Sequence, residues 1–122
     1  MNFTFSDTHE MIRTTARDFA RDEIASSVIE RDKNGVFPKE IVQKLGELGF
    51  LGMMVPEQWG GAGLDALSYV IAMEEISKID ASVGVIMSVN KSLVCWGLET
   101  YGKDDQKERF LRPFASGQKL GA

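Results

Sequence analysis

The sequence predicts an all-α fold, an up-and-down bundle of five to six helices, and three observations lead to this prediction. Apolar residues recur at intervals of three and four through most of the chain, which places them on one face of a helix. Residues that start and stop helices stand at intervals of helix length. No segment alternates apolar and polar residues for more than a few positions, so the sequence predicts no strand.

The first helix is predicted to begin at Asp7. Asp7 and Glu10 have the spacing of a capping box, in which each side chain accepts a hydrogen bond from a free backbone N–H group of the first turn. An apolar stripe that starts at Ile12 then continues the helix to about Asp32. We expect a bend near Ser26.

A turn at Asn34-Gly35 separates this helix from the second. Pro38 is expected as the first residue of the second helix, because its fixed φ suits that position. Gly49 is expected as the left-handed stop of this helix. The next segment contains three glycines in four residues, Gly60-Gly61-Ala62-Gly63, which predicts a shaped loop, since glycine is costly inside a helix.

Three more helices are predicted after the loop. Asp65 caps the third, which ends near Asp80. The fourth continues to Tyr101 and is apolar on most faces, as expected of a helix at the centre of a bundle. We expect its apolar region, residues 83–98, to be too short and too polar for a membrane span. Asp104 caps the fifth helix, which Pro113 is expected to break or kink.

Composition excludes several classes of protein. The chain has 122 residues, of which 43% are hydrophobic, as in a soluble single domain with one core. Its net charge of −4 argues against nucleic acid as a partner, because nucleic-acid affinity comes mainly from clustered Lys and Arg. With the single cysteine Cys95 and the single histidine His9, neither an internal disulfide nor a zinc or di-iron site is expected. Residues 1–7 do not resemble a targeting signal, so we expect a cytoplasmic location.

Three features suggest chemistry, and each also has a structural interpretation. Glu74 and Glu75 could be paired carboxylates, but helical neighbours point about 100° apart, which favours one solvated side chain and one that contacts a neighbouring element. Cys95 lies among apolar residues and is expected in the core. The glycine loop could bind a phosphate, but it lacks the lysine and the strand-helix setting of nucleotide motifs, so a tight turn is favoured.

Several short motifs follow one another in a recognisable order. They are Pro56-Glu57, Gly60-Gly61 and Gly63, then Met73-Glu74-Glu75-Ile76, Met87-Ser88-Val89-Asn90, Tyr101-Gly102 and Gln106-Lys107. In order and spacing, over essentially the whole chain, this pattern resembles the N-terminal helical domain of flavin-dependent acyl-CoA dehydrogenases, and the short-chain, butyryl-type branch in particular.

This resemblance implies a three-part oxidoreductase, with a middle β domain and a C-terminal helical domain after the present one, usually assembled as a homotetramer. A glutamate removes the α proton of an acyl-CoA substrate, the β hydrogen passes to FAD, and an electron-transfer flavoprotein accepts the electrons. The catalytic glutamate belongs to the C-terminal domain, so no catalytic or FAD-binding residue is assigned to this chain.

The same resemblance assigns a substrate-binding role to Val85, Ile86 and Val89, which would contact the acyl chain and limit its length. The alternative is that all three are packing residues of a bundle. The resemblance also divides the chain into the helical domain, residues 1–117, and the start of the middle β domain, residues 118–122. The chain is therefore expected to be truncated before the middle β domain.

Two other interpretations remain open. One is a stand-alone helical module that binds acyl chains or docks onto a dehydrogenase without redox activity. The other is a structural domain without a ligand. The chain also departs from the family at Ala25-Ser26, where many members have Ala-Pro, which puts the bend at this position in question.

Overall fold

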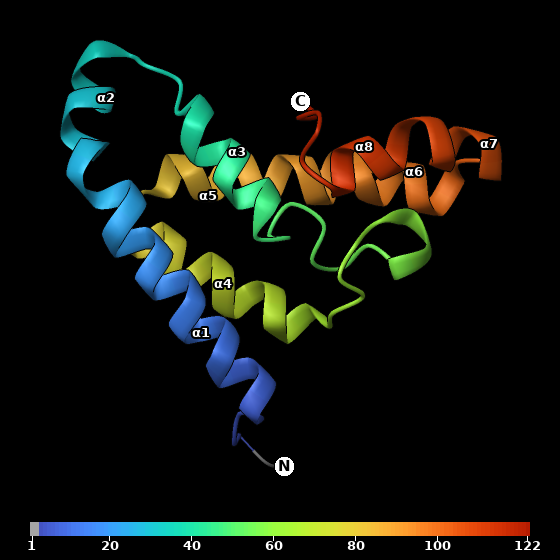
Figure 1. The fold of residues 1–122 in the computed structure, drawn as a ribbon, viewed down its shortest axis with the longest axis horizontal. Helices are drawn as coiled ribbons and strands as arrows, with labels where there is room; N and C mark the ends of the chain where they lie inside the picture. The colour runs from blue at the N-terminus through green and yellow to red at the C-terminus, as the bar shows by residue number, and fades with distance from the viewer. Residues whose placement is uncertain (1–2) are drawn as a thin grey trace.

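The computed structural model describes residues 3–122 (Figure 1), so Met1 and Asn2, which the predicted domain range 1–117 includes, lie outside the described residues. Within residues 3–122 every regular element is helical, which confirms the predicted all-α class. The elements in chain order are α1 (Asp7–Phe19), η1 (Ala20–Ile24), η2 (Ala25–Ser27), α2 (Val28–Asn34), α3 (Lys39–Glu47), η3 (Glu57–Trp59), α4 (Ala66–Ile79), α5 (Ala81–Ser88), η4 (Val89–Cys95), α6 (Trp96–Tyr101), α7 (Asp104–Gln106), η5 (Lys107–Leu111) and α8 (Arg112–Ala115).

The first helix begins at Asp7 as predicted, but its cap lies one residue earlier. The Ser6 hydroxyl accepts from the backbone N–H of His9 at 3.2 Å, and Nδ1 of His9 accepts from the backbone N–H of Ser6 at 3.2 Å. The predicted box of Asp7 and Glu10 is therefore wrong. A hydroxyl and an imidazole nitrogen perform the reciprocal capping that the sequence pattern assigned to two carboxylates.

This helix loses its regular α pattern near the predicted bend. It widens into the π-helical η1, tightens into the 3₁₀ turn η2, and becomes α-helical again in α2. Ser27, at the junction, has φ −112° and ψ 0°. The irregularity therefore occurs without a proline, although serine alone does not require it.

The turn and the stop around α3 match the predictions, apart from a shift of one residue. Gly35 has φ 63° and ends α2, and Gly49 has φ 82°, so both occupy the left-handed region that glycine tolerates best. Pro38 precedes α3 as its N-cap, and the helix begins at Lys39.

The long apolar helix extends from Ala81 to Tyr101 as α5, η4 and α6, with a π-helical segment at its middle. Its 21 residues are long and apolar enough to cross a membrane, so the expectation that this region is too short and too polar for a span is wrong. By length and composition alone this is weak support for a membrane helix, because core helices of soluble proteins meet the same criteria. Here Val83, Met87 and Cys95 pack into the protein core.

The last helix begins at Asp104, although its cap differs from the prediction. Lys103 occupies the N-cap position, and its backbone N–H donates to the Gln106 side-chain oxygen at 2.9 Å. Pro113 does not break the helix, which continues to Ala115. The chain widens into the π-helical η5 over the five residues before Arg112. Proline is tolerated near the start of a new α-helical segment, where its missing N–H matters least.

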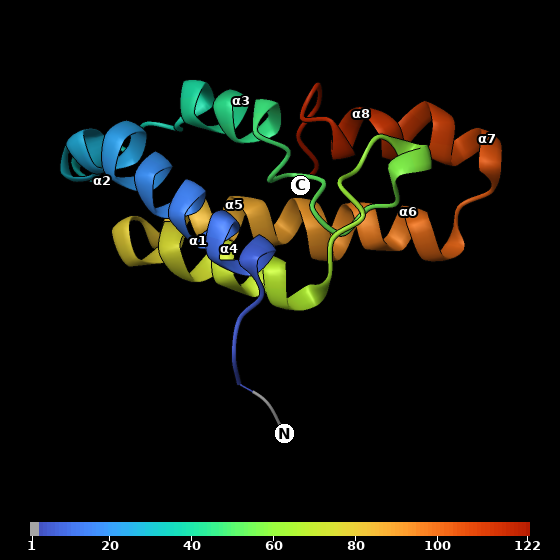
Figure 2. The same cartoon turned by 60° about the horizontal axis from the view of Figure 1, so that its bottom comes forward.

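The core consists of two apolar clusters. Figures 1 and 2 show α1 and α4 side by side, and α7 and α8 lying along the second half of the long helix. The larger cluster joins α1, α3, α4 and α5, whereas the smaller one joins the end of the long helix to the last helix. The long helix is not enclosed as predicted, because Val85, Leu93, Trp96 and Tyr101 are exposed along it.

Candidate functional site

The start of the long helix, which carries the predicted acyl-contact residues, is fixed by a buried ion pair. The Asp80 carboxylate caps α5 by accepting from the backbone N–H of Ser82 at 2.9 Å, and it lies 2.8 Å from the guanidinium of Arg31. Burial alone would raise the pKa of Asp80. The hydrogen bonds from Ser82 and Arg31 outweigh it and lower the pKa below its ordinary value. The pair therefore ties the start of α5 to α2.

The three predicted acyl-contact residues lie between this start and the first residue of η4, and they differ in exposure. Val85 is 59% exposed. Ile86 is half-buried, packs against the larger core cluster, and lines a hollow of about 660 Å³ together with Phe37 and Ile79. Val89 is half-buried at the start of η4. Of the three residues, Ile86 therefore combines contact with the core and a place in the lining of this hollow.

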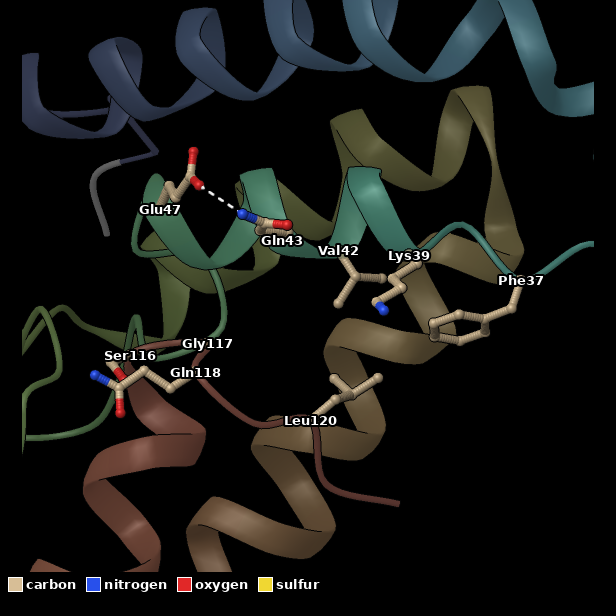
Figure 3. Close-up of a pocket in the computed structure, with 9 residues that line it drawn as sticks. All are labelled: Phe37, Lys39, Val42, Gln43, Glu47, Ser116, Gly117, Gln118 and Leu120. Atoms are coloured by element: carbon tan, nitrogen blue, oxygen red, sulfur yellow. Dashed lines mark hydrogen bonds between the residues drawn. The ribbon is translucent and has the colours of Figure 1, made fainter.

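A second hollow, which the sequence did not predict, lies between α3 and the C-terminal segment, residues 116–122. Figure 3 shows Val42 and Phe37 on one side of it and Leu120 on the other. Its volume is about 550 Å³. Gln43 and Glu47 border it as a hydrogen-bonded pair at 3.3 Å.

Phe37 borders both hollows and is 55% exposed. An aromatic side chain next to a turn and a proline was the available signal for it. The contribution of Leu120 had no such signal, because it depends on how the C-terminal segment folds back.

The glycine loop is a packed turn, as the sequence interpretation favoured, and its geometry does not fit a phosphate cradle. Each backbone N–H from Gly60 to Leu64 donates to a carbonyl of residues 52–57 at 2.8 to 3.2 Å. A Cβ atom at Gly61 would lie 2.0 Å from the Val55 carbonyl oxygen, so two backbones meet there. Because these amides are already paired, the loop offers none of them to the pyrophosphate of a dinucleotide such as FAD.

The two adjacent glutamates separate into the roles expected of a structural pair. Glu75 is buried and accepts two hydrogen bonds of 3.1 Å from Arg17, while Lys78 donates to it at 3.1 Å. The hydrogen bond from Arg17 lowers the pKa of Glu75 despite the opposing effect of burial. Glu74 is exposed and pairs only with Lys78 among the ion pairs of residues 3–122.

The remaining candidate groups are structural as well. Cys95 is 1% exposed, and burial raises the pKa of its thiol to about 11, which leaves it protonated at neutral pH. His9 Nε2 lies 3.2 Å from the Asp65 carboxylate and links the starts of α1 and α4. No cluster of three or more His, Cys, Asp or Glu side chains that could hold a metal occurs within residues 3–122.

These observations describe a helical domain that supplies shape and apolar surface. Its sequence matches the family described as "Acyl-CoA dehydrogenase, N-terminal domain" over residues 6–118. The chain therefore belongs to this family, which confirms the resemblance and the fold class expected from it.

Individual relatives agree with this assignment. The short-chain specific acyl-CoA dehydrogenase of Rattus norvegicus mitochondria is 50% identical over 115 residues, which cover 94% of this chain and 28% of that protein. The butyryl-CoA dehydrogenase structure from Megasphaera elsdenii superposes with a TM-score of 0.92 at 37% identity, covering 98% of this chain and 32% of that one.

A chain in a structure of the electron transferring flavoprotein of Acidaminococcus fermentans gives a TM-score of 0.95 at 39% identity, with the same coverage of 98% and 32%. This chain thus spans about a third of the length of the proteins that it matches.

Proposed function

We propose that this chain is the N-terminal domain of an FAD-dependent acyl-CoA dehydrogenase that introduces a double bond between the α and β carbons of a short-chain acyl-CoA thioester. The observation that carries the proposal is the 50% identity, over 94% of this chain, to a short-chain specific enzyme. The proposed acceptor of the electrons is an electron-transfer flavoprotein, and the proposed assembly is a homotetramer. The catalytic base and the FAD site would belong to parts of the protein outside these 122 residues.

Within that enzyme, the proposed role of this domain is to form one wall of the acyl pocket with Val85, Ile86 and Val89. The exposed side chain of Val85 and the half-buried side chains of the other two support this role, because a wall residue must still have apolar surface to offer. Larger side chains in this wall would exclude longer acyl chains before shorter ones, since each added methylene of the acyl chain needs space in the pocket. The firm attachment of α5 through Asp80 and Arg31 would hold the wall in place.

The wall can be tested by enlarging it in the complete polypeptide that contains this domain. Val89→Trp is expected to lower kcat/KM for hexanoyl-CoA at least about tenfold more than for butyryl-CoA, which corresponds to about 1.4 kcal/mol of discrimination. Val70→Trp is the matched control, because Val70 is 56% exposed on α4. Equal effects of Val89→Trp on both substrates would count against a pocket wall at this position.

The alternative of a stand-alone acyl-binding or docking module predicts different behaviour of the 122-residue chain by itself. We expect the purified chain to be colourless, not to reduce a dye with butyryl-CoA, and to give no measurable heat of binding with butyryl-CoA in calorimetry. Binding of butyryl-CoA by this flavin-free chain would favour the module. Flavin absorbance that survives gel filtration would contradict the assignment of the FAD site to other parts of the protein.

A further inference from the structure

Asn90 is a buried side chain outside the proposed wall, and its carboxamide is hydrogen-bonded at both the nitrogen and the oxygen. It is 0% exposed and lies in η4, directly after Val89. Its Nδ2 amide donates to the carbonyl of Leu51 at 3.1 Å and to the carbonyl of Phe114 at 3.3 Å. Its Oδ1 atom accepts from the backbone N–H of Gly121 at 2.9 Å. One side chain therefore bonds to the backbone of three segments that are far apart in the sequence.

The chemistry of these partners determines both the residue type and its orientation. Two carbonyls require donors and one N–H requires an acceptor, which is the set that a carboxamide provides. Aspartate would place an oxygen against the Leu51 and Phe114 carbonyls. Leucine, of similar size, would leave the buried polar groups at Leu51 and Gly121 without this partner.

The helix is locally rearranged where Asn90 lies. The buried positions Val83, Met87 and Asn90 follow the three- and four-residue steps of an α-helix, but the next is Cys95, a step of five. A π-helical segment contains an extra residue and shifts the helix face in this way. The shift lets the first half of the helix pack on the larger core cluster and the second half on the smaller one. Asn90 lies where the two halves meet.

The backbone of the C-terminal segment is held by contacts with both α8 and η4. The N–H of Lys119 donates to the carbonyl of Pro113 at 3.1 Å. A Cβ atom at Gly121 would lie 2.5 Å from both methyl carbons of Val94, so the Gly121 backbone lies directly on that side chain. Asn90 and Val94, one turn apart, thus hold Gly121 from the same helix.

We propose that Asn90 is a positioning residue, which couples the backbone of the C-terminal segment at Gly121 to the helical turn that carries Val89. This inference rests on the proposed function for its meaning: the segment that the family resemblance places at the boundary with the β domain would be held in fixed register with the wall of the acyl pocket. A displacement of Gly121 would then displace the turn that carries Val89, and the reverse, through the side chain of Asn90.

The experiment uses the 122-residue chain without flavin or acyl-CoA, with NMR as the readout. In Asn90→Leu, hydrogen exchange of the Gly121 amide is expected to accelerate relative to wild type. The factor of acceleration should be at least tenfold larger than the factor for the slowest core amides of the same variant. Val83→Ala is the matched control, because Val83 is buried on the same helix and belongs to the larger core cluster. It should accelerate the Gly121 amide and the core amides by the same factor.

A reciprocal measurement tests the coupling from the other end. Deleting residues 119–122 is expected to shift the methyl signals of Val89 in the wild-type background, and this shift should be lost in Asn90→Leu. Unchanged Val89 signals after the deletion, or a shift that persists without Asn90, would overturn the proposal. If Asn90→Leu does not fold, the deletion in the wild-type chain still decides whether the two ends are coupled.

Because no ligand takes part, the result is independent of the acyl-chain selectivity of Val89→Trp. Failure of either experiment therefore leaves the other proposal separately testable.

Discussion

At the scale of single residues, the domain places charges where they join helices. Glu75 on α4 and Arg17 on α1 form a doubly hydrogen-bonded pair, and Asp80 and Arg31 form a second pair between α5 and α2. Both carboxylates are buried, so each depends on its partner to offset the loss of water. These pairs give the helix contacts a specific geometry that apolar packing alone would not require.

Glu75→Gln is expected to destabilise the 122-residue chain by about 1 to 2 kcal/mol. The value lies well below that for a fully buried pair, because the Arg17 side chain is 56% exposed. Urea unfolding followed by circular dichroism gives the free energy of unfolding. Glu74→Gln is the control on the neighbouring exposed pair and should cost less than about 0.5 kcal/mol.

The same carboxylate gives a pH dependence with a definite sign. The pKa of Glu75 is lowered in the folded state, so its contribution to stability is complete above the ordinary value of 4.5 and is lost as the pH falls through the folded-state pKa. The stability difference between wild type and Glu75→Gln should therefore shrink as the pH is lowered below about 4.5. A difference that grows on acidification would contradict the lowered pKa.

At the scale of elements, glycines decide how closely segments approach. A Cβ atom at Gly52 would lie 2.3 Å from the Ala115 carbonyl oxygen, whereas one at Gly97 would meet nothing within 4 Å. Gly97 lies in α6, inside the long helix. The two positions therefore distinguish a glycine needed for packing from one that only lowers helix propensity.

Gly52→Ala is expected to cost about 2 kcal/mol, since either the loop or the end of α8 must shift. Gly97→Ala should stabilise the chain by about 0.5 to 1 kcal/mol through helix propensity. Thermal unfolding of both variants beside the wild type measures the two effects. A loss of stability in Gly97→Ala would show that the space beside it is needed.

Local patterns predicted the helices, because the determinants of helix position are local. Asp65 caps α4 as expected, through a 2.8 Å hydrogen bond from the backbone N–H of Ser68, and Gly35 and Gly49 end α2 and α3. The π-helical segments were not predicted. One of them, η4, lies where the long helix passes from the larger core cluster to the smaller one, which is a tertiary requirement.

The candidate site was less predictable than the fold. Val85, Ile86 and Val89 were assigned by family resemblance, and their role in acyl binding stays a prediction. The hollow beside Leu120 and the bonds of Asn90 depend on the C-terminal segment folding back onto α3 and η4, a contact between distant parts of the sequence. Periodicity and spacing contain no information on such a contact.

At the scale of the whole molecule, one side of the long helix is open. Leu93 is 70% exposed, Trp96 48% and Tyr101 77%, and the rings of the last two pack edge to face. Apolar side chains gathered in this way favour association over remaining in water. The relatives that this chain matches are more than three times as long, and we propose that this surface packs against the remainder of such a protein.

Leu93→Lys is expected to reduce self-association of the 122-residue chain, measured as a lower weight-average mass in sedimentation equilibrium at matched concentration. Because Leu93 is exposed, the free energy of unfolding should change by no more than about 0.5 kcal/mol. Thr100→Lys, also exposed on this helix, adds the same charge and controls for repulsion alone. Equal masses for the two lysine variants would mean that charge, and not loss of the apolar side chain, causes the effect.

The paired amides of the glycine loop have a practical consequence for engineering this domain. Residues 60–64 are rich in glycine and outside any helix, so by composition they would be chosen for a peptide tag or a fluorescent insertion. Their backbone N–H groups are hydrogen-bonded to carbonyls of residues 52–57. An insertion there would separate the backbones of Gly61 and Val55, which are in direct contact. The connection from Gly35 to Phe37 is exposed, and a Cβ atom at Gly35 would meet nothing within 4 Å, which makes it the better position for a label.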